Sequence, residues 1–126
     1  MLYEITSQKS LEEIGRGLQE AAARHGFGVI AVHNLKETMA SKGVEYPGEC
    51  LVYEVCNPHQ AKRVLELSGA ISAALPCRIS VYQTADGYRL ATILPTVLLQ
   101  MFGSAEAEPA AREVEAAMTA MMRESA

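Results

Sequence analysis

The chain has 126 residues, of which 49% are hydrophobic and 21% charged, and its formal net charge is −4. These values are typical of a single globular domain and exclude an intrinsically disordered chain. The negative charge and the few aromatic residues argue against a nucleic-acid-binding protein, which needs basic groups to displace counterions and rings for base stacking.

The N-terminal residues and the cysteines indicate the compartment. Residues 1–5 include Glu4 and lack the cationic start of a signal peptide, and no apolar run approaches the ~20 residues of a membrane span. We therefore expect a cytoplasmic protein with reduced thiols and no membrane partner. Cys50 and Cys56 share one predicted strand, which would separate their Cα atoms by ~20 Å, so no disulfide is expected between them.

The first third of the chain predicts a strand, a helix and a second strand. Residues 2–6 alternate as a short strand, and Ser10 and Glu13 form a capping-box pattern ahead of a helical apolar stripe. Gly26 suits the left-handed position that follows a helix. Residues 27–33 are expected to form the second strand.

The middle of the chain contains a polar connection, a third strand and a second long helix. Residues 34–49 are polar, with a single helical turn expected at 36–40. Residues 50–56 form the third predicted strand. Asn57 is a good N-cap and Pro58 suits the first helical position, so a helix is expected to begin here and to end at Gly69.

The last third predicts a hairpin followed by two helices. A short turn at 71–75 is stopped by Pro76, and residues 77–83 alternate as a half-buried strand. Asp86-Gly87 is a hairpin turn into a strand at 88–93. One helix is expected at 95–102, and another from Pro109 onward.

The predicted order is β-α-β-β-α-β-β-α-α. In each β-α-β unit we expect a right-handed crossover between parallel strands, and in each β-β step an antiparallel pair. Helices mainly on one face of a mixed five-stranded sheet give an α+β, two-layer sandwich.

Three motifs resemble a known bacterial and archaeal family, domain of unknown function 302. They are Gly26-Phe27-Gly28-Val29, Cys56-Asn57-Pro58 and Pro76-Cys77, in that order. The resemblance covers residues 1–102 and implies an α+β sheet fold, a homodimer and a loose similarity to half of a TATA-binding protein. It implies no activity. Residues 103–126 are less typical, and we expect them to form a C-terminal helix packed on the same domain.

The Cys-Asn-Pro junction is the strongest candidate for chemistry. Cys56 directly precedes a predicted helix start, where unsatisfied N–H groups and the positive dipole end favour a thiolate. His59 lies in the first turn, and Glu54 shares the strand parity of Cys56. The alternative is that Cys56 is a small buried residue and His59 a solvated side chain, which is the commoner case.

A second thiol, Cys77, begins the fourth predicted strand. A simple parallel crossover would place Cys56 and Cys77 at opposite edges of the sheet, ~15–20 Å apart. They would converge only if the turn at 71–75 folds the chain back. The two-to-four-residue spacing typical of zinc ligands is absent, so neither a metal nor a cofactor is expected.

Two functions remain open. The leading hypothesis is a small homodimeric binding or accessory protein that uses a sheet face or a helix–sheet cleft for a ligand or protein partner. The alternative is a thiol-dependent protein that handles sulfur species or a soft metal through Cys56, with Cys77 and His59. Because no catalytic triad, metal motif or paired carboxylates can be recognised, the sequence favours a protein that is not an enzyme.

Overall fold

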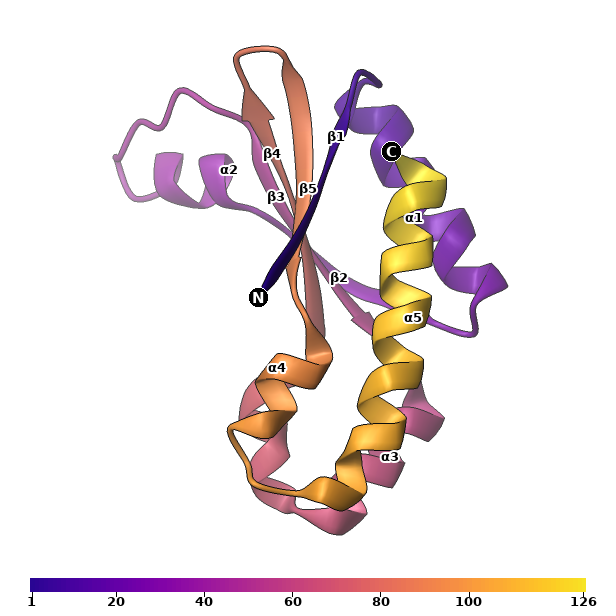
Figure 1. The fold of residues 1–126 in the computed structure, drawn as a ribbon. Coiled ribbons are helices and arrows are strands. Elements are labelled where there is room, and N and C mark those ends of the chain that lie inside the picture. The colour runs from indigo at the N-terminus through magenta and orange to yellow at the C-terminus, as the bar shows by residue number, and fades with distance from the viewer.

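A computed structural model describes residues 1–126, and its centre is a single five-stranded sheet (Figure 1). The strands run in the order β1-β5-β4-β3-β2, and each neighbouring pair is antiparallel. Their bounds are Leu2–Ser7 for β1, Gly28–Asn34 for β2, Cys50–Cys56 for β3, Cys77–Thr84 for β4 and Gly87–Ile93 for β5. The α+β class and the five strands are confirmed, whereas the prediction of a mixed sheet with parallel crossovers is wrong.

Both helical connections depart from the simple crossover. β1 and β2 lie at opposite edges of the sheet and do not pair, although α1 joins them. β3 and β4 are neighbours, but the chain returns to the same end of the sheet, so that Val55 pairs with Cys77. The connection that makes this return consists of α3 and the 3₁₀ segment η1 (Gly69–Ala74).

The helices begin close to where the sequence predicts them. Their bounds are Leu11–Arg24 for α1, Leu35–Ala40 for α2, Pro58–Leu67 for α3, Pro95–Gln100 for α4 and Glu108–Ser125 for α5, with a 3₁₀ turn, η2, at Ala105–Ala107. The element order is thus β-α-β-α-β-α-β-β-α-α, because the turn expected at 36–40 is a complete short helix. The capping box of Ser10 and Glu13 is formed. Gly26 has φ +76°, as the end of α1 requires.

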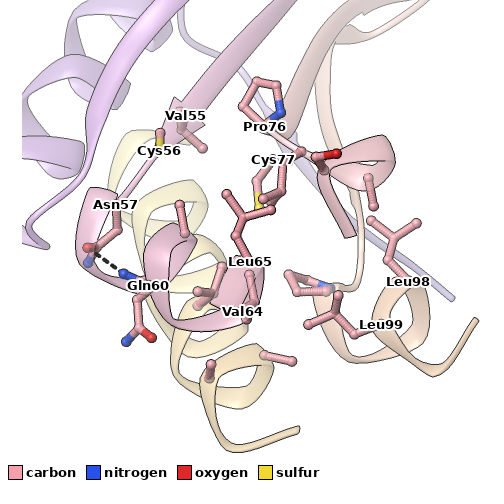
Figure 2. A pocket seen from close by; sticks show the side chains of 18 of the residues that line it. Val55, Cys56, Asn57, Gln60, Val64, Leu65, Pro76, Cys77, Leu98 and Leu99 are labelled. Carbon is pink, nitrogen blue, oxygen red and sulfur yellow. Dashed lines mark hydrogen bonds between the residues drawn. The ribbon is translucent and has the colours of Figure 1, made fainter. Parts of the chain in front are cut away.

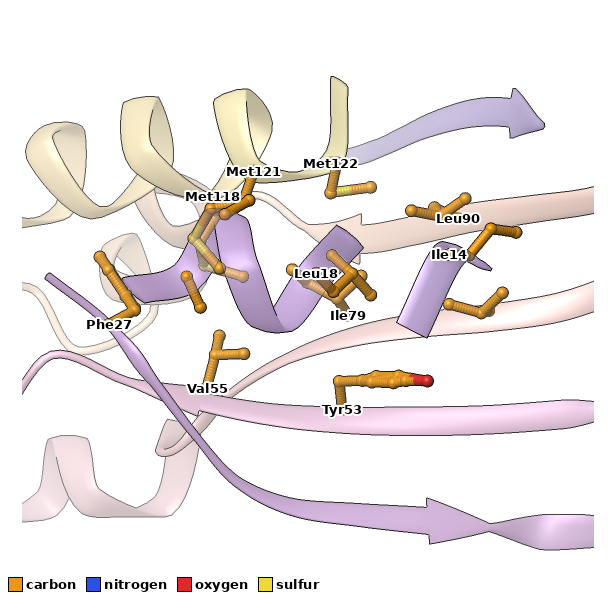
Figure 3. Close-up of a cluster of buried hydrophobic side chains, with 13 residues drawn as sticks. Ile14, Leu18, Phe27, Tyr53, Val55, Ile79, Leu90, Met118, Met121 and Met122 are labelled. Atoms are coloured by element: carbon orange, nitrogen blue, oxygen red, sulfur yellow. The ribbon is translucent and has the colours of Figure 1, made fainter. Parts of the chain in front are cut away.

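The main core lies between one face of the sheet and the pair of helices α1 and α5. Alternate residues of the central strands, such as Val55 and Ile79, meet Leu18 from α1 and Met118 from α5, and Figure 3 shows these side chains in one cluster. The C-terminal helix is therefore part of this core. Burying each such side chain contributes about 1.5–3 kcal/mol of transfer free energy.

A smaller core lies beyond the end of the sheet. It joins Val64 of α3 and Ile71 of η1 to Ala107 and Ala110 near the start of α5, with α4 packed beside it. Figure 1 shows α3 and α4 gathered at this end, while the long helix α5 passes from there along the sheet to α1. One helix thus contributes to both cores.

The opposite face of the sheet is not covered by α1 or α5. Ala91, Ser80 and Val52 lie side by side at its centre, as the strand registers require. The same row ends in Glu4 on β1 and His33 on β2. In Figure 1, α2 stands apart from the other helices. None of the helices has the length and apolar character needed to span a lipid bilayer.

Candidate functional site

A cavity of about 310 Å³ lies where the two cores meet, at the end of the sheet. Its walls come from α3, η1, α4 and α5 and from the ends of β3 and β4 (Figure 2). Of its 19 lining residues, 14 are hydrophobic, and three have amide or hydroxyl side chains: Asn57, Gln60 and Ser72. The cavity falls at the lower end of the size range of small-molecule sites and shares their apolar character.

The junction between β3 and α3 forms one wall. The Asn57 side chain accepts hydrogen bonds from the N–H groups of His59 (3.0 Å) and Gln60 (3.3 Å), and Pro58 occupies the first turn. The predicted N-cap is therefore confirmed. Because the cap fixes the start of α3, it aims Ala61, Val64 and Leu65 into the cavity.

The return of the chain through η1 brings the second thiol to the same cavity. Cys77 pairs in register with Val55, the residue before Cys56, and both cysteines line the cavity. The expected separation of Cys56 and Cys77 is thus wrong, because the condition for convergence, a chain folded back before Pro76, is met. Figure 2 shows both side chains at the sheet end of the cavity.

The thiol of Cys77 is suited to burial rather than to ionisation. Burial raises the pKa of Cys77 to about 11, and the charge that Cys56 would carry adds to this effect. Burial also raises the pKa of Cys50, which lies on β3 outside the cavity. All three cysteines are free thiols. At neutral pH Cys77 is therefore almost wholly protonated and acts as a small, weakly polar part of the wall.

Two of the residues singled out in the sequence lie outside the cavity. His59 is exposed and is not among the lining residues. Glu54 faces the uncovered side of the sheet, where its carboxylate pairs with His33. No group of three or more His, Cys, Asp or Glu side chains is arranged to hold a metal ion. Of the four candidates, only the two cysteines are brought together.

The far walls of the cavity were not identified from the sequence. They comprise Leu98 and Leu99 of α4 with Ala111 and Val114 of α5. The apolar stripes of these helices predict burial but do not distinguish a packed contact from a cavity wall. The run of small residues at the start of α5, which leaves room beside α3, is the one signal present in the sequence.

The lining amides are largely engaged with their own surroundings. Gln60 donates through Nε2 to Glu113 (2.7 Å) and accepts at Oε1 from Arg63 (3.2 Å). Arg63 in turn contacts Glu113 at 2.7 Å, so this exposed cation is already paired. Asn57 uses its Oδ1 atom to cap α3. The cavity is therefore bounded by an apolar surface with a closed polar network at its rim.

Comparison with known proteins agrees with this fold. A crystal structure described as an uncharacterized conserved protein DUF302 from Bacillus stearothermophilus superposes with a TM-score of 0.94 at 26% sequence identity, covering 99% of this chain and 98% of that chain. Among curated proteins no significant match is found. The family model described as "Domain of unknown function DUF302" matches residues 3–125, which includes α5. The chain therefore belongs to the DUF302 family.

Proposed function

We propose that the protein binds a small, predominantly apolar molecule in the cavity between α3, η1, α4 and α5. The observation that carries this proposal is a cavity of about 310 Å³ with 14 hydrophobic residues among 19 lining it. The cavity opens to solvent on one side, so a small molecule can enter it and bury apolar surface against both cores. This is a binding function rather than catalysis, in a cytoplasmic setting that keeps the thiols reduced.

The alternative, thiol-dependent chemistry, receives less support. The alternative gives Cys56 the helping groups Cys77 and His59, but burial raises the pKa of Cys77 to about 11 and keeps this second thiol protonated at neutral pH. His59, the expected acid, base or ligand, is exposed away from the cavity. The cysteines are better suited to contacting a ligand, because sulfur packs favourably against aromatic rings.

Binding of indole tests the proposal. A ligand of about nine non-hydrogen atoms gaining ~0.5 kcal/mol per atom would bind with a dissociation constant of about 0.5 mM, which ligand-observed NMR detects. Ala61→Phe, on the α3 wall, places a ring in the cavity and should abolish the signal. Ala116→Phe, exposed on α5 outside the cavity, should leave it unchanged. Indole binding that is equal in both variants would contradict the proposal.

We also propose that the protein forms a homodimer through the face of the sheet opposite α1 and α5. β4 is the central strand, so a two-fold axis along β4 lays β1 of one copy over β2 of the other. Glu4 and His33 end the same row of residues, and this symmetry brings Glu4 of one copy to His33 of the other. The small side chains at the centre allow close approach of the two sheets.

The size of this face sets the expected affinity. Five strands at ~4.8 Å spacing and ~20 Å in length give roughly 500 Å² in plan per copy, which is at the low end for specific interfaces. We therefore expect a dimer that dissociates on dilution through the micromolar range. Ser80→Arg, at the centre of the face, should give a monomer, and Ala116→Arg on α5 should not. Light scattering that finds the wild type monomeric at about 1 mM would exclude the dimer.

A further inference from the structure

We propose that the ligand of this cavity is uncharged, and that the cavity rejects carboxylates of the same shape. This inference rests on the binding function proposed above and specifies its ligand class. None of the 19 lining residues is an acid, a base or a histidine. A carboxylate placed against this wall would lose part of its hydration and would find no cation in the wall.

The ion pair beside Gln60 is already neutralised. Arg63 lies on α3 but outside the lining, and its guanidinium contacts the Glu113 carboxylate at 2.7 Å. Gln60, which does line the cavity, is held by the same two side chains, through Nε2 and Oε1. Because Glu113 already balances the charge of Arg63 and accepts from Gln60 Nε2, a ligand anion gains little from either side chain. The network at the rim thus does not attract anions.

The free hydrogen-bonding capacity of the wall is small. Asn57 Oδ1 accepts from two backbone N–H groups, which leaves the Nδ2 group of Asn57 available as a hydrogen-bond donor. The other polar atoms are the Ser72 hydroxyl and the thiols of Cys56 and Cys77, and thiols are weak donors. No buried side-chain nitrogen or oxygen lacks a partner, so the wall demands no polar ligand group. An apolar molecule with at most one weak acceptor matches this surface.

The volume limits the size of the ligand. A cavity of about 310 Å³ equals the share of roughly ten water molecules at ~30 Å³ each. This corresponds to a molecule of one or two rings or a short branched chain. Burying an unpaired carboxylate is costly enough that the anion of such a molecule should bind at least ~100-fold more weakly than its neutral counterpart.

Indole and indole-3-carboxylate test the inference directly, because they share a ring system and differ by one negative charge. Titration of the wild-type protein with each, followed by protein NMR, should show indole binding with shifts in α3 and α5, and carboxylate binding at least ~100-fold weaker. Equal affinities would overturn the inference and leave the binding function standing. Binding of neither compound would overturn both.

A charge introduced into the wall provides the converse test. Leu65 and Leu67 are both on α3 and are similarly exposed, at 38% and 40%, but only Leu65 lines the cavity. Leu65→Lys should strengthen carboxylate binding by at least ~10-fold, while the matched Leu67→Lys should not change it. If the two variants act alike, electrostatics of the wall do not control ligand choice and the inference fails. Unfolding midpoints of both variants report whether the fold is retained.

Discussion

Replacing Cys77 with serine is expected to remove part of the stability loss that the protein undergoes at alkaline pH. Burial, and secondarily Cys56, raises the pKa of Cys77 from 9.0 for an exposed thiol to about 11. As the pH rises between these values, the unfolded chain loses this proton before the folded protein does. The stability associated with the protonated thiol is therefore complete below about pH 9 and is lost as the pH rises through about 11.

The size of the effect follows from the two pKa values. A difference of two units corresponds to about 2.7 kcal/mol when fully expressed. At about pH 10.5 the linkage relation gives about 2 kcal/mol, and at about pH 8 it gives less than ~0.1 kcal/mol. Serine has nearly the same shape as cysteine and does not titrate in this range, so the variant lacks this contribution.

The stability contribution of the Cys77 thiol is measured by urea unfolding of the wild type and Cys77→Ser at about pH 8 and about pH 10.5. The wild type should lose about 2 kcal/mol more of its free energy of unfolding than Cys77→Ser. Burial also raises the pKa of Tyr53 and Cys50, but these groups are present in both proteins, so their contribution cancels in the comparison. A stability difference that stays constant between the two pH values would refute the assignment of Cys77 as a buried, protonated wall residue.

Three further changes test the fold around the cavity. Asn57→Ala should lower the free energy of unfolding by about 1 kcal/mol, because two N–H groups at the start of α3 lose their acceptor, whereas Asn57→Asp should retain most of it. Leu18→Ala, at a fully buried position of α1, should cost about 2–5 kcal/mol in the same assay. Hydrogen bonds from His25 and Arg24 lower the pKa of Glu124, so its stabilisation is present above about pH 4.5 and is lost as the pH falls; Glu124→Gln should therefore show a flatter acid unfolding profile.

Local features of this fold are accessible from the sequence, because they depend on neighbouring residues. The capping box at Ser10, the Asn57-Pro58 helix start and the alternation in β4 each identify an element from a few side chains. Strand pairing depends instead on where the chain goes after a helix. A connection as long as that between Cys56 and Cys77 is compatible with a parallel crossover and with a return to the same end of the sheet.

The same distinction explains what was missed at the candidate site. Cys56 was singled out from the sequence and does line the cavity, but its neighbours there depend on the return through η1 and on how α5 lies beside α3. Glu54 illustrates the limit of parity arguments. It alternates in phase with Cys56 along β3, yet Cys56, at the strand end, lines the cavity while Glu54 pairs with His33 on the other face.

The edge position of β1 has a consequence for how the chain reaches its native state. β1 pairs only with β5, and α1 packs mainly against α5, so the first elements made find their partners among the last. Ser7 even donates its hydroxyl to the Ala126 carbonyl across 119 residues of sequence. Such high contact order slows folding, because long loops must close before their contacts form. During synthesis the amphipathic helix α1 therefore emerges long before α5, which buries its apolar stripe. Until α5 is made, this stripe is exposed and can bind other apolar surfaces.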